Sequence, residues 1–346
     1  MGDTSGASTP RIRPRLRVRI YTAVVLILGL PLSLIALDSM WTAATSDDRS
    51  TEIVAVSPGY PDAETYDPTR ATVFLNGLGR DISTDQAQAL TPSVGQFGRV
   101  YALQYAPVFD PNEAADTVRE TVGMPPGSGQ VTHLTVVASS MGDVRGLELI
   151  ASLSERHANA VTVVGFVVNT GPGPDKRIRV RGGPTVQALL DQSCSAFVPG
   201  RASLGLMEIV NQTLQGHVTD VDGAAIAYSA GTEYRGQVVV NQLCSLTRPS
   251  AIADPPFVPF SVYLATGFPL DDVIVDGEGA YADWLKVLPG MEIRRIEGTT
   301  HDNLSYRPDL FNPVFAEDLM PLIRNQQIAR TRVERSLDGP GVRRPV

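Results

Sequence analysis

The chain of 346 residues is poor in cysteine, histidine and aromatic residues. It contains two cysteines, Cys194 and Cys244, and four histidines, and aromatic residues make up only 6% of it. Two cysteines cannot form a zinc site by themselves, so neither a metal nor another cofactor is expected. They permit one disulfide if the chain is exported, and two free buried thiols are the alternative. With four histidines in the chain, there are few candidates for a histidine general base.

Basic residues are also scarce, since 29 Lys and Arg stand against 37 Asp and Glu, for a net charge of -8. Several of the basic residues are gathered near the start, where residues 1–19 contain five arginines and one acidic residue, Asp3. The remaining chain is therefore more acidic than the net charge indicates. An acidic body argues against nucleic acid as a partner. The apolar fraction of 43% is ordinary for a globular protein of this length, which can bury a core.

Residues 20–37, directly after the arginines, are uncharged and mostly apolar. As a helix they would be about 27 Å long, close to the hydrocarbon thickness of a bilayer. The arginines of 1–19 are expected to stay in the cytoplasm, which places the rest of the chain outside it. We therefore predict a single-pass membrane protein with one N-terminal transmembrane helix. The alternative is a cleaved signal peptide and a secreted protein.

Strand and helix patterns alternate after a linker at 38–70, which contains one expected strand at 52–56. The further expected strands are 71–75, 99–105, a run centred on 134–137, 160–168, 260–266 and 291–296. The expected helices begin near Ser83 and Gly142 or span 112–122, 280–287 and 313–326. This alternation predicts an α/β fold with a mostly parallel sheet and helices on both faces.

Residues 171–256 interrupt this alternation, and they contain both cysteines. A segment of that length inside a compact domain is expected to form a substructure of its own. We interpret it as a cap, or lid, inserted into an α/β core made of residues 71–170 and 257–328. The tail at 329–346 is predicted to be disordered.

The most informative motif is a serine that follows an apolar run of β-branched residues. A sharp strand-to-helix turn that presents a nucleophilic serine needs small residues two positions before and after it. Ala138 and Gly142 flank Ser140 at those positions, whereas Val137 and Met141 flank Ser139. Ser140 is therefore the candidate nucleophile, and a serine-glycine turn without chemistry is the alternative.

Among the four histidines, His301 is the best candidate for the base that would take the proton of Ser140. It lies in a loop after a late strand, at the sheet edge where ligands of parallel sheets bind. His133 begins its strand, His157 ends the helix that follows Ser140, and His217 falls in the predicted cap.

The candidate acid follows the expected strand 260–266. Asp272 is preferred over Asp271 because the apolar residues after it would return the chain to the fold, and Asp276 is third. An oxyanion also needs two backbone N–H donors. We expect them from Met141, directly after the nucleophile, and from Leu78 in the glycine-flanked loop 76–79, for which a simple tight turn is the alternative.

These residues together resemble the α/β-hydrolase superfamily. The resemblance covers about residues 70–325 and rests on the serine turn 138–142, the loop 76–79 and the order Ser140, Asp272, His301. The chain departs from the family pattern where Ala138 replaces the usual glycine and where Asn76 stands in place of a common histidine.

The resemblance implies a serine hydrolase that cleaves carboxylic esters through an acyl-enzyme intermediate, and the predicted anchor places it outside the cytoplasm. The expected substrates are small-molecule or lipid-like acyl esters, because the predicted cap contains apolar stretches. An acyltransferase or a peptidase would use the same three residues. A membrane-tethered binding protein without catalysis is a further alternative.

Overall fold

The computed structural model describes residues 50–77, 80–106, 109–124, 130–174, 257–267, 275, 277–299, 301 and 304–337. The predicted anchor at 20–37 lies outside these ranges, and so do both cysteines and almost all of the predicted cap. In the ranges that are described, no helix combines the length and the apolar character that a membrane span requires.

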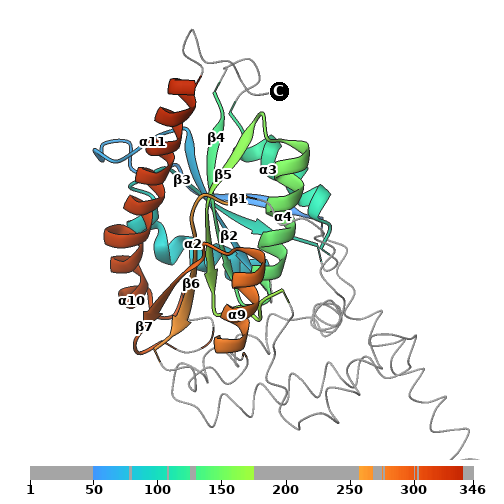
Figure 1. Cartoon of the computed structure of the whole chain (residues 1–346), viewed down its shortest axis with the longest axis vertical. Coiled ribbons are helices and arrows are strands. Elements are labelled where there is room, and N and C mark those ends of the chain that lie inside the picture. The colour runs from blue at the N-terminus through green and yellow to red at the C-terminus, as the bar shows by residue number, and fades with distance from the viewer. Residues whose placement is uncertain are drawn as a thin grey trace, which may run out of the picture.

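Seven strands form one sheet in the order β1-β3-β2-β4-β5-β6-β7 (Figure 1). The strands are β1 (Glu52–Ser57), β2 (Arg70–Asn76), β3 (Arg99–Gln104), β4 (Thr132–Ser139), β5 (Val161–Asn169), β6 (Ser261–Thr266) and β7 (Glu292–Ile296). All neighbouring pairs are parallel except β1 with β3, which is antiparallel. The mostly parallel sheet predicted from the sequence is therefore confirmed.

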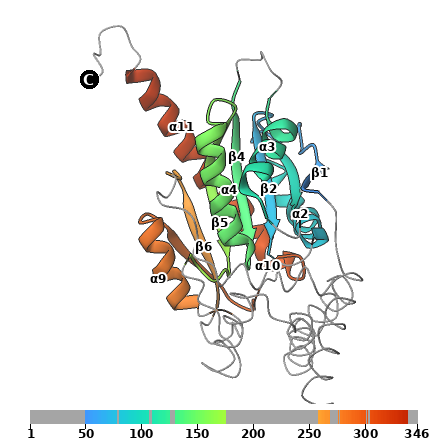
Figure 2. The ribbon, with the colours of Figure 1, turned by 90° about the vertical axis from the view of Figure 1, so that its right-hand side faces the viewer.

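Helices cover both faces of the sheet, as Figures 1 and 2 show. They are α2 (Arg80–Val94), α3 (Pro111–Val122), α4 (Gly142–Arg156), α9 (Gly277–Val287), α10 (Pro308–Pro313), the π-helical turn η1 (Val314–Leu319) and α11 (Met320–Leu337). One apolar layer joins the sheet to α3, α4 and α9, and it includes Leu147, Phe166 and Trp284. The other joins it to α2 and the C-terminal helices, and it includes Phe74 and Phe315. Because both faces are buried, the central strands contain near-continuous apolar runs.

The first strand lies inside the segment 38–70 that was expected to be a linker. The predicted strand at 52–56 is present as β1, and its pairing with β3 makes it part of the sheet. Its residues are exposed or only partly buried, as expected for an edge strand. The ordered sheet therefore begins before residue 71.

The C-terminal helix differs at both ends from the helix predicted at 313–326. Helical structure begins at Pro308, because proline fits the first turn of a helix, where its missing N–H is not needed. It continues through η1 and α11 to Leu337, so it enters the tail 329–346 that was expected to be disordered. The sequence 329–337 contains no glycine or proline, which favours continuation of the helix.

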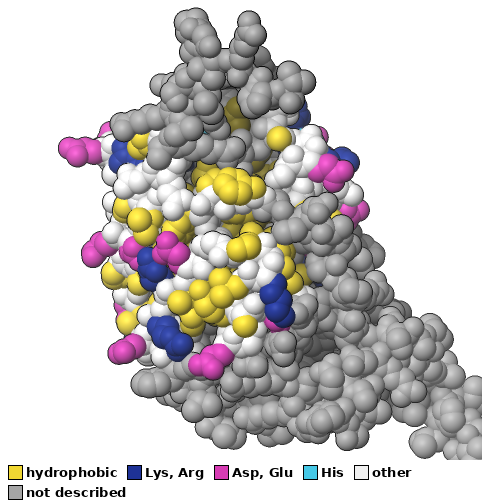
Figure 3. Space-filling model, in the orientation of Figure 1, with side chains coloured by type: hydrophobic (Ala, Val, Ile, Leu, Met, Phe, Trp, Pro, Cys, Tyr) yellow, Lys and Arg dark blue, Asp and Glu magenta, His cyan; other side chains and the backbone are white. Residues whose placement is uncertain are grey.

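Charged side chains of both signs lie next to each other over the face seen in Figure 3. One such group is formed by Arg294, which pairs with Asp318 at 2.8 Å and with Glu292 at 2.8 Å on the surface of the protein. These neighbours raise the pKa of Arg294, chiefly through its hydrogen bond to Asp318. Such exposed pairs contribute little to stability, typically below about 1 kcal/mol.

Candidate active site

Ser140 forms the turn between β4 and α4, and its backbone has a φ of 56°. This left-handed conformation costs a non-glycine residue about 1–2 kcal/mol, so the surroundings must hold it. Its N–H donates to the carbonyl of Asn169 at 2.9 Å, and its carbonyl accepts from the N–H of Asp143 at 3.1 Å. The turn therefore has the strained strand-to-helix geometry that presents a serine side chain.

The neighbouring Ser139 is part of β4 and is completely buried. It lies in register with Asn76 of β2 and Asn169 of β5, and its Oγ accepts from Asn169 Nδ2 at 2.8 Å. This hydrogen bond ties the ends of β4 and β5 together directly below the turn. The hydroxyl of Ser139 thus has a structural role in the sheet, and Ser140 remains the candidate nucleophile.

Close packing at the turn explains its small residues. An added Cβ at Gly142 would lie 2.6 Å from the carbonyl oxygen of Leu75, so only glycine fits. Ala138, which replaces the glycine usual in the resembled family, is accommodated by a second glycine on α4. A Cβ at Gly146 would lie 3.0 Å from the Cβ of Ala138 and 2.9 Å from the ring of Phe166. Gly146 lies one helical turn after Gly142, and its lack of a side chain leaves room for the methyl group of Ala138.

His301 lies beside Ser140, although 161 positions separate them in the sequence. Nε2 of His301 and Oγ of Ser140 are 2.8 Å apart, and the exposed fractions of the two residues are only 9% and 5%. This is the distance that a serine nucleophile and its base require. Because Nε2 faces the serine, Nδ1 is the ring nitrogen that an acid would contact.

The loop that carries His301 is held by its own hydrogen bonds. It leaves β7 through Gly298, whose φ is 77°, and Thr299 Oγ1 donates to the carbonyl of Ile296 at 2.6 Å. Arg307 Nη1 donates to the carbonyl of Gly298 at 3.3 Å. Arg307 also binds Asp309, and this contact holds the pKa of the Asp309 carboxyl below its ordinary value. These hydrogen bonds hold the backbone at 296–299, shortly before His301.

Met141 is the N-cap of α4, so its backbone lies at the positive end of that helix. Gly77, at the end of β2, lies directly against it: an added Cβ at Gly77 would be 2.5 Å from Met141 N. The loop predicted to provide the second N–H donor therefore leaves the sheet beside the first one. The second donor itself, Leu78, lies outside the described residues.

The structure brings together Ser140, Met141 and His301 from the sequence prediction. Asp272 lies outside the described residues, as do Asp271 and Asp276. In the described part of the chain, no group of His, Cys, Asp and Glu is arranged to hold a metal ion.

The two other described histidines are remote from the serine along the elements that carry them. His133 is the second residue of β4, and Ser139 ends that strand. His157 is the C-cap of α4, the helix that begins after the serine. Both positions agree with those expected from the sequence.

Two residues of the site went unrecognised in the sequence. Asn169 supports the turn through its carbonyl and its amide, and Tyr105 donates a hydrogen bond to Gly77. Both stand at the carboxyl end of a parallel strand or directly after it, where functional residues concentrate. That position is the signal that could have identified them.

No protein-family model matches the sequence, and no curated protein is significantly similar to it. Solved structures do match. MenH from S. aureus has a TM-score of 0.50 at 10% identity, over 80% of this chain and 99% of that chain. An esterase (EaEST) from Exiguobacterium antarcticum has a TM-score of 0.49 at 13% identity, over 79% of this chain and 94% of that chain.

The likeness to MenH concerns the fold, because the sequence identity is low. It agrees with the mostly parallel sheet and its order of strands. The chain therefore has the α/β-hydrolase fold.

Proposed function

We propose that this protein is a serine hydrolase that cleaves carboxylic esters through an acyl-enzyme intermediate. The observation that carries the proposal is the 2.8 Å contact between Ser140 Oγ and His301 Nε2 at a strained turn. A serine hydroxyl is a weak nucleophile unless a base within hydrogen-bond distance takes its proton. Backbone strain concentrates at functional sites, so the left-handed conformation of Ser140 supports the proposal.

In the proposed reaction, Ser140 Oγ attacks the ester carbonyl carbon while His301 Nε2 takes its proton. The carbonyl oxygen becomes an oxyanion, which the N–H of Met141 and the predicted donor Leu78 would stabilise. The C–O bond to the alcohol then breaks, and His301 gives its proton to the leaving oxygen. A water molecule, deprotonated by His301, attacks the acyl-serine in the same way and releases the carboxylic acid and Ser140.

The remaining parts of the sequence prediction belong to this proposal. Asp272 would contact Nδ1 of His301 and stabilise the imidazolium that forms during each half-reaction. The segment 171–256 would cover the site and receive the acyl chain of a small-molecule or lipid-like ester. The segment 20–37 would anchor the protein, with the catalytic domain outside the cytoplasm.

A fluorophosphonate probe tests the nucleophile, because it reacts with serines that a base has activated. The wild-type protein should be labelled and Ser140→Ala should not. Ser139→Ala, the same change one position earlier, should keep most of the labelling once circular dichroism shows that it is folded. His301→Ala should slow labelling by about 10²–10⁴-fold. Absence of labelling in the folded wild-type protein, or equal labelling of Ser140→Ala, would refute the proposal.

Hydrolysis of p-nitrophenyl esters extends the same experiment to the acid and the substrate. Among Asp272→Asn and Asp271→Asn, the first should have the larger loss of kcat. A series of acyl chain lengths should show higher kcat/KM for longer chains if the substrate is lipid-like.

A further inference from the structure

Tyr105 connects the ends of two strands at the candidate active site. It follows β3 directly, and its hydroxyl donates to the carbonyl oxygen of Gly77, after β2, at 2.8 Å. Only 6% of Tyr105 is exposed. The proposed reaction assigns this residue no step, so its buried hydrogen bond calls for an explanation of its own.

The carbonyl that Tyr105 binds belongs to the peptide group that joins Gly77 to residue 78. A peptide group is planar, and in its trans form the C=O and the following N–H point in opposite directions. A hydrogen bond that fixes the Gly77 carbonyl therefore also fixes the direction of the next N–H. That N–H belongs to Leu78, the second oxyanion donor of the proposed function.

Gly77 makes such a restraint necessary. Glycine has the widest choice of backbone conformations, so the peptide group after it rotates easily. The position nevertheless requires glycine, because a Cβ there would lie 2.5 Å from both the N and the Cβ of Met141. The close approach to Met141 thus requires glycine, and glycine does not by itself restrict the orientation of its carbonyl.

Tyr105 is itself held in a fixed position by aromatic and cationic neighbours. Its ring packs edge-on against Phe109, with centroids 5.1 Å apart and an interplanar angle of 84°. The guanidinium of Arg145 lies 5.4 Å from the centroid of Phe109, and Arg145 pairs with Glu148 at 2.8 Å. Burial raises the pKa of Tyr105, so its hydroxyl keeps the proton that it donates.

We propose that Tyr105 is a positioning residue for the oxyanion: its hydroxyl holds the Gly77 carbonyl, and with it the peptide group that leads to the predicted second donor. The inference rests on the proposed function, since it assigns Tyr105 to the stabilisation of that reaction's oxyanion. Tyr105 acts through the Gly77 peptide group and takes no part in proton transfer.

The test is Tyr105→Phe in the full chain, which removes the hydroxyl and keeps the ring. Tyr281→Phe is the matched control, because Tyr281 also donates to one backbone carbonyl, that of Met291, at 3.0 Å. Loss of an oxyanion donor costs about 10²–10³-fold in kcat, so a misdirected donor should cost about 10–100-fold. KM for a p-nitrophenyl ester should stay within about threefold.

A trifluoromethyl ketone provides a readout that a merely structural role would not change. Ser140 adds to its carbonyl carbon and forms an oxyanion, so its inhibition constant should rise in Tyr105→Phe by about the same factor as kcat falls. Phe109→Leu, which loosens the ring of Tyr105, should produce a smaller change in the same direction. This second variant serves the test if Tyr105→Phe does not fold.

The outcomes separate the inference from the function on which it rests. If the wild-type protein hydrolyses the ester and Tyr105→Phe matches Tyr281→Phe in kcat and inhibition, the inference is wrong and the serine hydrolase stands. A change in KM or thermal stability alone would also overturn it. If the wild-type protein neither hydrolyses the ester nor binds the ketone, the proposed function fails and the inference fails with it.

Discussion

At the scale of single residues, the site depends on glycines that let two backbone segments meet. Gly77, Met141 and Gly142 bring the end of β2 into contact with the start of α4. Ser140 adds the strained φ of 56°, and Thr170, after β5, has a φ of 54°. Strain of this kind persists where the surrounding structure fixes the backbone, and it concentrates at functional sites.

Gly77→Ala should reduce the rate of fluorophosphonate labelling by at least about tenfold. The new Cβ would lie 2.5 Å from Met141 N, so the β2 loop and the first oxyanion donor must move apart. Overpacking of this kind costs about 1–3 kcal/mol of stability. Gly290→Ala is the control, because an added Cβ there meets nothing within 4 Å, and its labelling should equal that of the wild type. Equal rates for the two variants would contradict the role assigned to this contact.

The sequence identified the serine because the rule for its small neighbours is local. Ala138 and Gly142 could be read directly from the chain. The compensation of Ala138 by Gly146 could not, since it depends on the distance between β4 and α4. The role of Tyr105 was hidden for the same reason, because its partner Gly77 lies on another strand.

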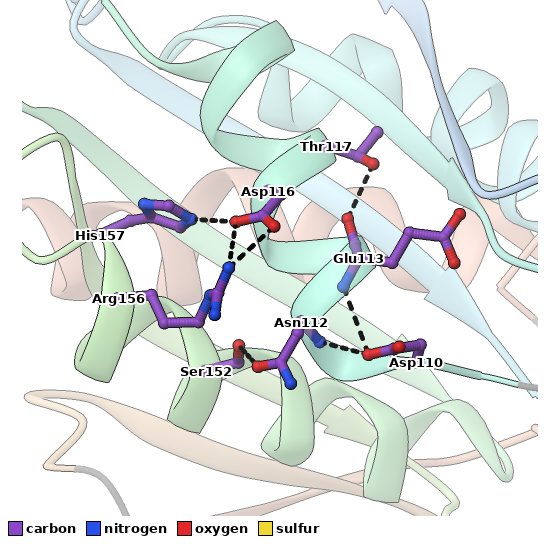
Figure 4. A network of polar contacts seen from close by, with 8 residues as sticks. All are labelled: Asp110, Asn112, Glu113, Asp116, Thr117, Ser152, Arg156 and His157. Carbon is purple, nitrogen blue, oxygen red and sulfur yellow. Dashed lines mark hydrogen bonds and ion pairs between the residues drawn. The ribbon is translucent and has the colours of Figure 1, made fainter.

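At the scale of elements, a polar network joins α3 to the end of α4 (Figure 4). Asp116 of α3 accepts from Arg156 at 2.9 and 3.0 Å and lies 2.6 Å from Nε2 of His157. The hydrogen bond from Arg156, followed by that from His157, holds the pKa of Asp116 below its ordinary value of 3.8. The network fixes the far end of the helix that begins at the nucleophile.

Asp116→Asn should lower the thermal midpoint near neutral pH, and the difference from the wild type should vanish in acid. A carboxyl whose pKa is lowered by folding adds stability at pH values above its unfolded pKa, and this contribution is lost as the pH falls through the folded value. The difference should therefore persist to about pH 4 and disappear below it. Thermal melts from pH 7 to pH 2 measure this, with Glu120→Gln on the same helix as the control. A difference that stays constant to pH 2 would show that the charge of Asp116 is irrelevant.

Strands and helices were predictable where their apolar period was clear and their ends carried ordinary signals. The predicted strand 260–266 and the predicted helix 112–122 agree with β6 and α3 to within one residue. The last helix was predicted to begin at residue 313, whereas helical structure begins at Pro308 and continues through Pro313 without a break.

At the scale of the whole molecule, the sheet collects residues from distant parts of the chain at one edge. The ends of β2, β4, β5 and β7 bring Gly77, Ser140, Asn169 and His301 together. The strand order that achieves this depends on pairings between segments far apart in sequence, which periodicity does not reveal. The sequence therefore predicted a mostly parallel sheet but not the order of its strands.

The predicted anchor at 20–37 would attach the whole molecule to a membrane, and cell fractionation tests this. The full chain should sediment with membranes and resist extraction at alkaline pH, while a chain that begins at Ser50 should remain in the supernatant. Both should react with the fluorophosphonate probe, since all described elements lie after that point. A truncated protein that still sediments with membranes would refute the anchor.

The pairing of β5 with β6 has a consequence for how this protein can change. These strands are neighbours in the sheet, yet residues 170–260 separate them in the chain. The entropy lost on closing such a loop grows only with the logarithm of its length, so doubling it costs about 0.6 kcal/mol. A change in the length of this segment therefore costs little loop-closure entropy. If the segment receives the substrate as proposed, its length can change while Ser140 and His301 stay in place.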